Sequence, residues 1–313
     1  MGLILGVDGG NSKTALLLAT TSGEVVSVAR GPGTNSHAVG AEAVADVIDG
    51  LVARSRAPLP VDHAAFFLCG ADVPSDIEGL ERAIDRRGWA RARTVDNDTF
   101  ALLRAGTDAE DAVAVICGAG INVVGRAAGG RSARYPSLGW ETGDWGGAEM
   151  LGREVLRLAA RAEDGRGART ALASIVREHF GAASVEAVGV EVHYRRLPQS
   201  RLAELAPAVI AAAAAGDAVA ASLVERLAVE VALMVRRTMR DLELDEADVV
   251  LGGGMLERGE GLLFESVLAQ LPLGARGLPA PDPPVLGAGL AALDAVGADG
   301  AAKARLRAEL RGR

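Results

Sequence analysis

A pattern that occurs twice constrains the fold of this chain more than any other feature: two apolar strands joined by a glycine-rich turn. In the first copy, residues 3–19, the turn reads Gly-Gly-Asn-Ser-Lys-Thr. In the second copy, residues 111–127, it reads Gly-Ala-Gly-Ile-Asn. The copies begin about 108 residues apart, and similarity at such a distance indicates repeated units. The sequence therefore predicts an α/β chain with two domains of related topology, the first of which begins with a mixed sheet.

The rest of the chain alternates short strands with helices, and its second half is mainly helical. Apolar residues at helical spacing, such as Val44, Ile48 and Leu51, mark the helices. Further strands are expected at 24–29, 64–69, 93–96 and 248–251. Helices are expected at 39–54, 76–87, 99–105, 147–162, 170–180, 184–194, 199–214, 217–242 and 287–296. A proline-rich linker is expected at 279–284, and disorder only at 305–313.

Composition excludes several classes of protein. Acidic residues outnumber basic ones by 41 to 33, for a formal net charge of −8, so neither nucleic-acid nor membrane binding is expected. The two cysteines, Cys69 and Cys117, are too few for a disulfide framework, and the four histidines show no ligand spacing. The start of the chain lacks a basic leader, and the alanine-rich stretch 205–216 is too short to cross a bilayer. A cytoplasmic location is therefore expected.

Three glycine turns, each at the end of an apolar strand, carry the expected chemistry. Glycine lets the backbone approach a ligand and direct successive N–H groups at it, which suits phosphate. The first turn also has Asp8 before it and Lys13 after it, but it is not a Walker A loop because Ser12 precedes the lysine. For any one of these turns considered alone, the alternative is that its glycines only allow a tight turn between strands and bind no ligand. The turns are Gly9-Gly10, Gly118-Ala119-Gly120 and Gly252-Gly253-Gly254.

These turns and several other motifs resemble those of a known superfamily. D-G-G-N-S-K-T at 8–14, G-A-G-I-N at 118–122 and L-G-G-G-M-L at 251–256 look like the phosphate-1, phosphate-2 and adenosine motifs of the sugar kinase, Hsp70 and actin ATPases. Within it, the chain is most similar to N-acetylglucosamine kinases and the BadF/BcrA ATPase family. The further matching segments are 34–35, 68–72, 97–99, 139–140, 143–147 and 213–220.

The resemblance implies two ribonuclease-H-like, actin-like ATPase domains flanking a nucleotide cleft. It divides the chain into an N-terminal acceptor and phosphate domain at 1–107, a C-terminal nucleotide-binding domain at 108–296, and a tail at 297–313 that packs back on the first domain. It also implies the cofactors ATP and Mg²⁺, with Asp8 near the metal. The residues expected to bind ATP are Gly9, Gly10, Ser12, Lys13, Thr14, Gly118, Ala119, Gly120, Gly252, Gly253 and Gly254.

Asp98 is the expected catalytic base. It follows a strand and precedes a helix, and by resemblance Asn-Asp-Thr at 97–99 matches the segment that carries the family's catalytic aspartate. A carboxylate that accepts the proton of an attacking hydroxyl would complete phosphoryl transfer. Two alternatives stay open: Asp98 only caps the helix, a role that Asn97 or Asp96 could take instead, or Asp96 is the base.

A sugar acceptor is expected to contact small polar side chains and one aromatic ring. The candidates are Asn35, Ser36, Asn122, Trp140, Glu141 and Asp144. Each candidate also has an interpretation without a ligand. The Asn and Asp residues could only stabilise turns, which these residue types favour. Trp140 could be packed in the core, and Glu141 could point to solvent. The sequence departs from the family here: only two residues separate Gly139-Trp140 from Gly143-Asp144, and Trp145 occupies a position where the family has Glu.

These residues together predict a sugar kinase that phosphorylates N-acetylglucosamine or glucosamine at the 6-hydroxyl. One alternative is the ATPase activator of a 2-hydroxyacyl-CoA dehydratase, whose iron–sulfur cluster would need Cys69 and Cys117, although both are expected inside strands. The other alternative is a sugar sensor without catalysis. The expected partners are ATP and a small sugar, and a homodimer is suggested only by the family.

Overall fold

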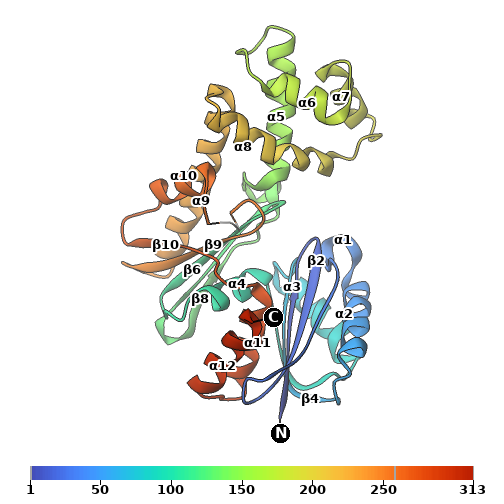
Figure 1. Ribbon diagram of the computed structural model, residues 1–313, viewed down its shortest axis with the longest axis vertical. Helices are drawn as coiled ribbons and strands as arrows, with labels where there is room; N and C mark the ends of the chain where they lie inside the picture. The colour runs from blue at the N-terminus through green and yellow to red at the C-terminus, as the bar shows by residue number, and fades with distance from the viewer. Residues whose placement is uncertain (1, 257–258, 313) are drawn as a thin grey trace. The chain divides into compact units, whose positions relative to one another are not determined.

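The computed structural model describes residues 2–256 and 259–312 and divides into two compact units (Figure 1). Unit 1 comprises Met1–Ala114, Val124–Pro136 and Ala280–Arg313, and unit 2 comprises Val115–Val123 and Ser137–Pro279. The grouping differs from the expected domains because residues 108–114, 124–136 and 280–296 belong to the unit that contains the N-terminus. Each unit is described below by itself.

The sheet of unit 1 brings three strand ends to one edge. Its order is β3-β2-β1-β4-β5, with β1, β4 and β5 parallel and β2 and β3 antiparallel to their neighbours. Gly9 of β1 pairs with Leu68 of β4, and Phe67 pairs with Asp96 of β5. Residues that follow these strands therefore gather at a single edge, where open α/β sheets bind ligands. The strands are β1 (Leu3–Gly9), β2 (Lys13–Thr20), β3 (Val25–Pro32), β4 (Val61–Leu68) and β5 (Ala90–Asp96).

Helices cover both faces of this sheet (Figure 1). One face packs on α2 (Ala41–Ser55) and α3 (Pro74–Asp85) through a core that includes Phe66 and Trp89. The other packs on α4 (Asp98–Gly106) and α11 (Pro284–Ala295). There α11 lies so close that a Cβ on Gly6 would come within 2.5 Å of the backbone nitrogen of Gly289. A short helix, α1 (Ser36–Val39), precedes α2.

A last helix, α12 (Gly300–Arg311), corrects the prediction of a disordered end. The prediction covered residues 305–313, of which Arg313 lies outside the described residues. Helix α12 packs against α11 and is fixed at its end by Glu309, whose carboxylate accepts a hydrogen bond from the backbone of Val25 at 2.8 Å. Arginine and alanine, which dominate this segment, favour helix once such contacts exist.

A second sheet has the order β10-β9-β6-β7-β8. Its two short outer strands, β8 and β10, were not predicted, because both are only partly buried and lack a continuous apolar run. A 3₁₀ turn, η1 (Ala128–Gly130), joins β7 to β8. The strands are β6 (Ala112–Cys117), β7 (Ile121–Ala127), β8 (Arg131–Arg134), β9 (Ala247–Gly252) and β10 (Ala275–Pro279).

Most helices of unit 2 follow the predicted pattern, with differences at 199–214 and at two helices that were not predicted, η2 and α10. Residues 199–214, expected as one helix, form a 3₁₀ helix and then α8, because Pro207 lacks the N–H that a continuous helix needs and fits only the first turn. In the described part of the chain, no helix combines the length and apolar character needed to cross a bilayer. The helices are η2 (Gly139–Thr142), α5 (Gly147–Glu163), α6 (Leu172–Phe180), α7 (Val185–His193), η3 (Gln199–Leu205), α8 (Ala206–Ala214), α9 (Ala218–Asp241) and α10 (Leu262–Gln270).

Candidate active site

Three aspartates stand at the carboxyl edge of the first sheet. Asp8 lies near the end of β1, Asp72 follows β4, and Asp98 follows β5 as the first residue of α4. Burial, reinforced by the charges of Asp8 and Asp72, raises the pKa of Asp98 to about 8. Burial also raises the pKa of Asp8 to about 7, against the opposing effect of Lys13. The edge therefore gathers three carboxyl groups, and burial favours the protonated forms of Asp8 and Asp98.

The structure separates the possible roles of Asp96, Asn97 and Asp98. Asn97 is the N-cap of α4, since its side-chain oxygen accepts a hydrogen bond from the backbone N–H of Thr99 at 2.9 Å. Asp96 is held by Arg134, whose guanidinium lies 2.7 Å away, and by the backbone N–H of Asn97 at 2.7 Å. Asp98 is therefore not the cap, and no side chain in the described residues pairs with its carboxylate.

The first glycine turn is shaped by close backbone packing. A Cβ on Gly9 would lie 2.2 Å from the hydroxyl oxygen of Thr34, and the N–H of Gly10 donates to the carbonyl of Lys13 at 2.9 Å. Ser12 and Lys13 are exposed, as a phosphate-binding role requires. The fully buried Thr14 instead donates its hydroxyl to Pro32 at 2.7 Å. Through this hydrogen bond Thr14 stabilises the first glycine turn against the end of β3.

Asn35 and Ser36 lie in the loop between β3 and α2 and are held by specific hydrogen bonds. The side-chain oxygen of Asn35 caps α1 by accepting from the N–H of His37 at 3.0 Å, and its amide donates to Asn11 at 3.1 Å. The hydroxyl of Ser36 donates to the carbonyl of Gly70 at 2.8 Å. The turn chemistry considered for Asn35 is therefore present, and it holds the loop in one conformation.

The second glycine turn, in unit 2, is fixed by the start of helix α5. The N–H groups of Ala148 and Glu149 donate to the carbonyls of Gly118 and Ala119 at 2.8 and 3.0 Å. A Cβ on Gly118 or on Gly120 would meet nothing within 4 Å. These glycines therefore border open space, and their lack of a side chain leaves room for a ligand.

The third glycine turn follows β9, also in unit 2. Gly253 has a φ of +86°, and a Cβ there would lie 2.6 Å from the carbonyl oxygen of Cys117. The fold itself thus requires glycine at this position. Gly252 ends β9, whereas a Cβ on Gly254 would meet nothing within 4 Å, so Gly254 is the member with space beside it.

The remaining acceptor candidates lie on β7 and around η2. Asn122 accepts a hydrogen bond from the hydroxyl of Ser137 at 2.9 Å. Trp140 is 69% exposed, which excludes core packing for this ring. Glu141 is exposed, and Asp144 accepts a short hydrogen bond from Thr142.

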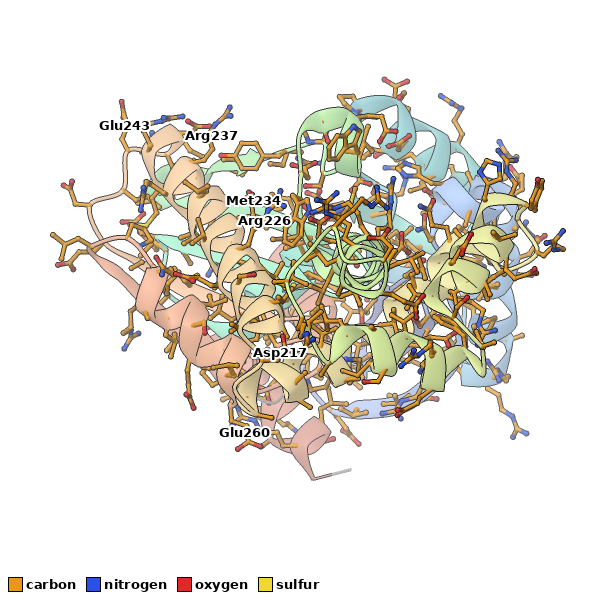
Figure 2. The ribbon with its side chains drawn as sticks, turned by 90° about the horizontal axis from the view of Figure 1, so that it is seen from above. Asp217, Arg226, Met234, Arg237, Glu243 and Glu260 are labelled. Carbon is orange, nitrogen blue, oxygen red and sulfur yellow. The ribbon has the colours of Figure 1, made fainter. Side chains whose placement is uncertain are left out.

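Trp145, where the sequence departs from the family, is buried rather than open to a ligand. It is 7% exposed, and the guanidinium of Arg226 lies 4.0 Å from the ring centroid, a favourable cation–π distance. Figure 2 labels Arg226 on helix α9, which begins after its N-cap Asp217. Trp145 thus ties the segment that carries Asp144 to α9.

Of the two cysteines, Cys117 lies in β6 as predicted, whereas Cys69 lies just beyond β4 and not in a strand. Burial and the charges of Asp98, Asp72 and Asp8 raise the pKa of the Cys69 thiol, and burial raises that of Cys117 to about 12. Sequence reasoning missed Asp72 as a site residue, although the segment 68–72 carried the signal. The described residues contain no group of three or more His, Cys, Asp or Glu side chains that could hold a metal ion.

Comparisons with known proteins identify a family and two related kinases. A model of the BadF/BadG/BcrA/BcrD ATPase family matches residues 5–292. An N-acetylmuramic acid/N-acetylglucosamine kinase of Clostridium acetobutylicum is 28% identical over 82% of this chain and 86% of its own. An N-acetyl-D-glucosamine kinase of Dictyostelium discoideum is 24% identical over 84% of this chain and 88% of its own.

Solved structures share the fold. A candidate N-acetylglucosamine kinase from Chromobacterium violaceum has a TM-score of 0.70 and 21% identity, with 94% of this chain and 99% of that chain covered. A ROK family glucokinase from Streptomyces griseus has a TM-score of 0.57 and 18% identity, with 94% and 100% covered. The predicted fold class, an α/β chain with actin-like ATPase architecture, is confirmed.

Proposed function

Because this chain belongs to the BadF/BadG/BcrA/BcrD ATPase family, we propose that it is an ATP-dependent amino-sugar kinase. Its reaction transfers the terminal phosphoryl group of ATP to the 6-hydroxyl of N-acetylglucosamine or glucosamine. The observation that carries the proposal is Asp98, a carboxyl group at the carboxyl edge of the sheet that does not cap its helix and, among the described residues, pairs with no cationic side chain. The names of both curated relatives support the substrate class.

Asp98 acts as the base in this proposal. As the 6-hydroxyl oxygen forms its bond to the γ-phosphorus, the hydroxyl proton moves to the Asp98 carboxylate and the bond to the ADP oxygen breaks. Burial and two neighbouring carboxylates raise the pKa of Asp98 to about 8, which makes its ionised form a stronger base than an exposed carboxylate. Asp96 is unsuited to this role, because Arg134 neutralises it.

ATP supplies the phosphoryl group, and Mg²⁺ is the metal that Asp8 fits. A buried carboxylate with its pKa raised to about 7 is stabilised when a cation approaches it. Mg²⁺ commonly uses one or two carboxylates and completes its shell with water and phosphate oxygens, which agrees with the lack of a three-ligand group among the described side chains. When bound, the metal would neutralise charge on the phosphates. Ser12, Lys13 and the glycine turns would hold the nucleotide.

The acceptor would contact the candidates Asn35, Ser36, Asn122, Trp140 and Asp144. Trp140 offers an exposed aromatic face of the kind on which sugars stack. The short segment between Trp140 and Asp144 can enclose less of a sugar than a longer one, so we propose that glucosamine or a larger N-acyl sugar competes with N-acetylglucosamine. The Clostridium relative named for both N-acetylmuramic acid and N-acetylglucosamine supports this breadth.

The dehydratase-activator alternative finds no support in the cysteines. Cys117 is buried, and burial raises the pKa of both thiols, whereas cluster ligands are thiolates. We expect the purified protein to be colourless and free of iron.

The test of the proposed function is ADP release measured against a panel of sugars, with the product examined by ³¹P and ¹³C NMR. The expected result is a phosphomonoester on carbon 6 of an amino sugar. Absence of sugar-dependent ADP release with every amino sugar would refute the proposal.

A further inference from the structure

The loop after β4, residues 69–72, lies between two segments that the proposed function uses. On one side the loop accepts two hydrogen bonds from Ser36, one from its hydroxyl to the carbonyl of Gly70 at 2.8 Å and one from its backbone N–H to the carbonyl of Cys69 at 3.2 Å. On the other side the carboxylate of Asp72 accepts from the side-chain amide of Asn97 at 2.7 Å. The loop thus joins the acceptor segment to the residue that precedes Asp98.

The hydrogen bonds of Asn97 fix which way its amide faces. Its oxygen must face the backbone N–H of Thr99, which it accepts at 2.9 Å, so its NH₂ group faces Asp72. Asn97 is 3% exposed, so water cannot readily replace either partner. Loss of the Asp72 acceptor would remove the hydrogen bond that ties the amide of Asn97 to the loop after β4.

A carboxylate is an unexpected choice for a merely structural acceptor at this position. The side chain of Asp72 is only 11% exposed. The basic side chains near it are His37, whose ring nitrogen lies 3.8 Å away, and Arg134, which already pairs with Asp96. Asp76, which binds the other nitrogen of His37 at 3.1 Å, and Asp98 add negative charge. A neutral acceptor would fill the same space with less repulsion.

We infer that Asp72 is a positioning residue of the kinase reaction, acting through the amide of Asn97 to hold the Asp98 carboxyl in place relative to the acceptor loop. The inference rests on the proposed function. A charge-assisted hydrogen bond is stronger and more directional than a neutral one, and a displacement of about 1 Å in a reacting group can cost roughly 100-fold in rate. Asp72 touches neither substrate nor nucleotide in this scheme.

The test exchanges donor and acceptor between the two positions with isosteric variants. Asn97→Asp replaces the amide that donates to Asp72 at 2.7 Å with a second carboxylate, and the two carboxylates repel each other. One oxygen at position 97 can still accept from the N–H of Thr99 and cap α4. We expect kcat to fall about 10- to 100-fold, with the KM for ATP unchanged. Adding Asp72→Asn supplies an amide donor from the other side, and we expect the double variant to recover most of the lost kcat. Asp72→Asn alone keeps an acceptor oxygen but loses the charge that strengthens the bond, so we expect kcat to fall by less than in Asn97→Asp but clearly below the wild-type value.

Asp76→Asn is the matched control. Asp76 also lies next to His37 and accepts from the backbone of Val73 at 3.1 Å, but it does not contact Asn97. We expect it to keep the wild-type kcat and to give no recovery when combined with Asn97→Asp. Thermal unfolding of each variant shows whether a change in kcat only follows a loss of folded protein.

Two outcomes have separate meanings. If the wild-type protein phosphorylates no amino sugar, the proposed function fails, and the inference fails with it. If the wild type is active but the double variant is no faster than Asn97→Asp, or if kcat falls only in parallel with the unfolding midpoint, the inference is overturned and the proposed function stands.

Discussion

The guanidinium of Arg134 lies 2.7 Å from the carboxylate of Asp96, and this pair distinguishes Asp96 from Asp98, two residues further on. Arg134 also stacks over the ring of Phe100, with 5.2 Å between guanidinium and ring centroid, so its position is fixed from two sides. Asp98 faces the negative charges of Asp8 and Asp72 instead. Burial raises the pKa of Asp96 as well, but Arg134 opposes that rise. Among the described residues no cation opposes the larger rise at Asp98, so Asp98 is the carboxyl group suited to exchange a proton.

The first prediction concerns that proton. Asp98→Asn should lower kcat by at least about 100-fold and leave the Kd for ATP nearly unchanged, because only proton acceptance is lost. Steady-state kinetics and calorimetric titration with ATP measure the two quantities. Asp96→Asn is the matched control and should cost far less. A near-native kcat in Asp98→Asn would remove this residue from the role of base.

The second prediction concerns stability and pH. The pKa of Asp98 rises from an ordinary value of 3.8 to about 8 in the folded protein, so between these values the folded state binds more protons than the unfolded state. The free energy of unfolding should therefore fall as pH rises through this window. Asp98→Asn removes that contribution, so the variant should gain stability relative to wild type as pH rises toward 8.

Urea unfolding without Mg²⁺, from acidic to mildly alkaline pH, gives the difference between the two proteins. Titrating groups that do not interact with Asp98 contribute equally to both and cancel, whereas Asp8 and Asp72 are coupled to Asp98 and titrate with it. A difference that stays constant across the window would show that the Asp98 carboxyl ionises normally.

The third prediction concerns Asp8. Asp8→Ala should shift the Mg²⁺ dependence of turnover to higher concentration without unfolding the protein, because a buried carboxylate that attracts the cation is lost. Circular dichroism checks the fold, and a Mg²⁺ titration at saturating ATP checks the function. A titration identical to that of the wild type would mean that Asp8 only ends its strand.

The sequence predicts much of the fold, and it places the candidate site residues on identifiable turns, because these signals are local. Glycine turns after apolar strands identify Asp8, Gly118 and Gly253 without knowledge of the fold. Local signals could not decide between Asn97 and Asp98 as the cap, since both types are good N-cap residues. The structure decides through the bond from the Thr99 N–H to Asn97.

Contacts between distant segments account for what the sequence could not predict. Asp72 and its partner Asn97 are 25 residues apart, and only the parallel pairing of β4 with β5 brings them together. Helix α12 depends on contacts such as that of Glu309 with Val25, 284 residues away. Thr14, expected on a phosphate, is turned inward by its bond to Pro32. Each of these three contacts joins residues from different segments, so no periodicity or spacing within one segment predicts it.

The last prediction concerns acceptor choice and Glu141. This residue belongs to η2, between the exposed Trp140 and Thr142, which donates to Asp144. A carboxylate beside the 2-position of the sugar would pair with the ammonium group of glucosamine but not with an acetamido group. Glu141→Gln should therefore lower kcat/KM for glucosamine and leave that for N-acetylglucosamine unchanged, with N-acetylmannosamine and glucose as further acceptors for comparison.

A site that binds a polar substituent discriminates strongly, because a mismatched acceptor leaves buried groups unpaired. Plain glucose, which lacks the nitrogen, should accordingly remain a poor acceptor for both proteins. The exposed position of Glu141 supplies the opposing interpretation, in which the carboxylate only faces solvent. If N-acetylglucosamine exceeds every other sugar by a wide margin and Glu141→Gln changes no ratio, the short segment between Trp140 and Asp144 does not broaden the acceptor range.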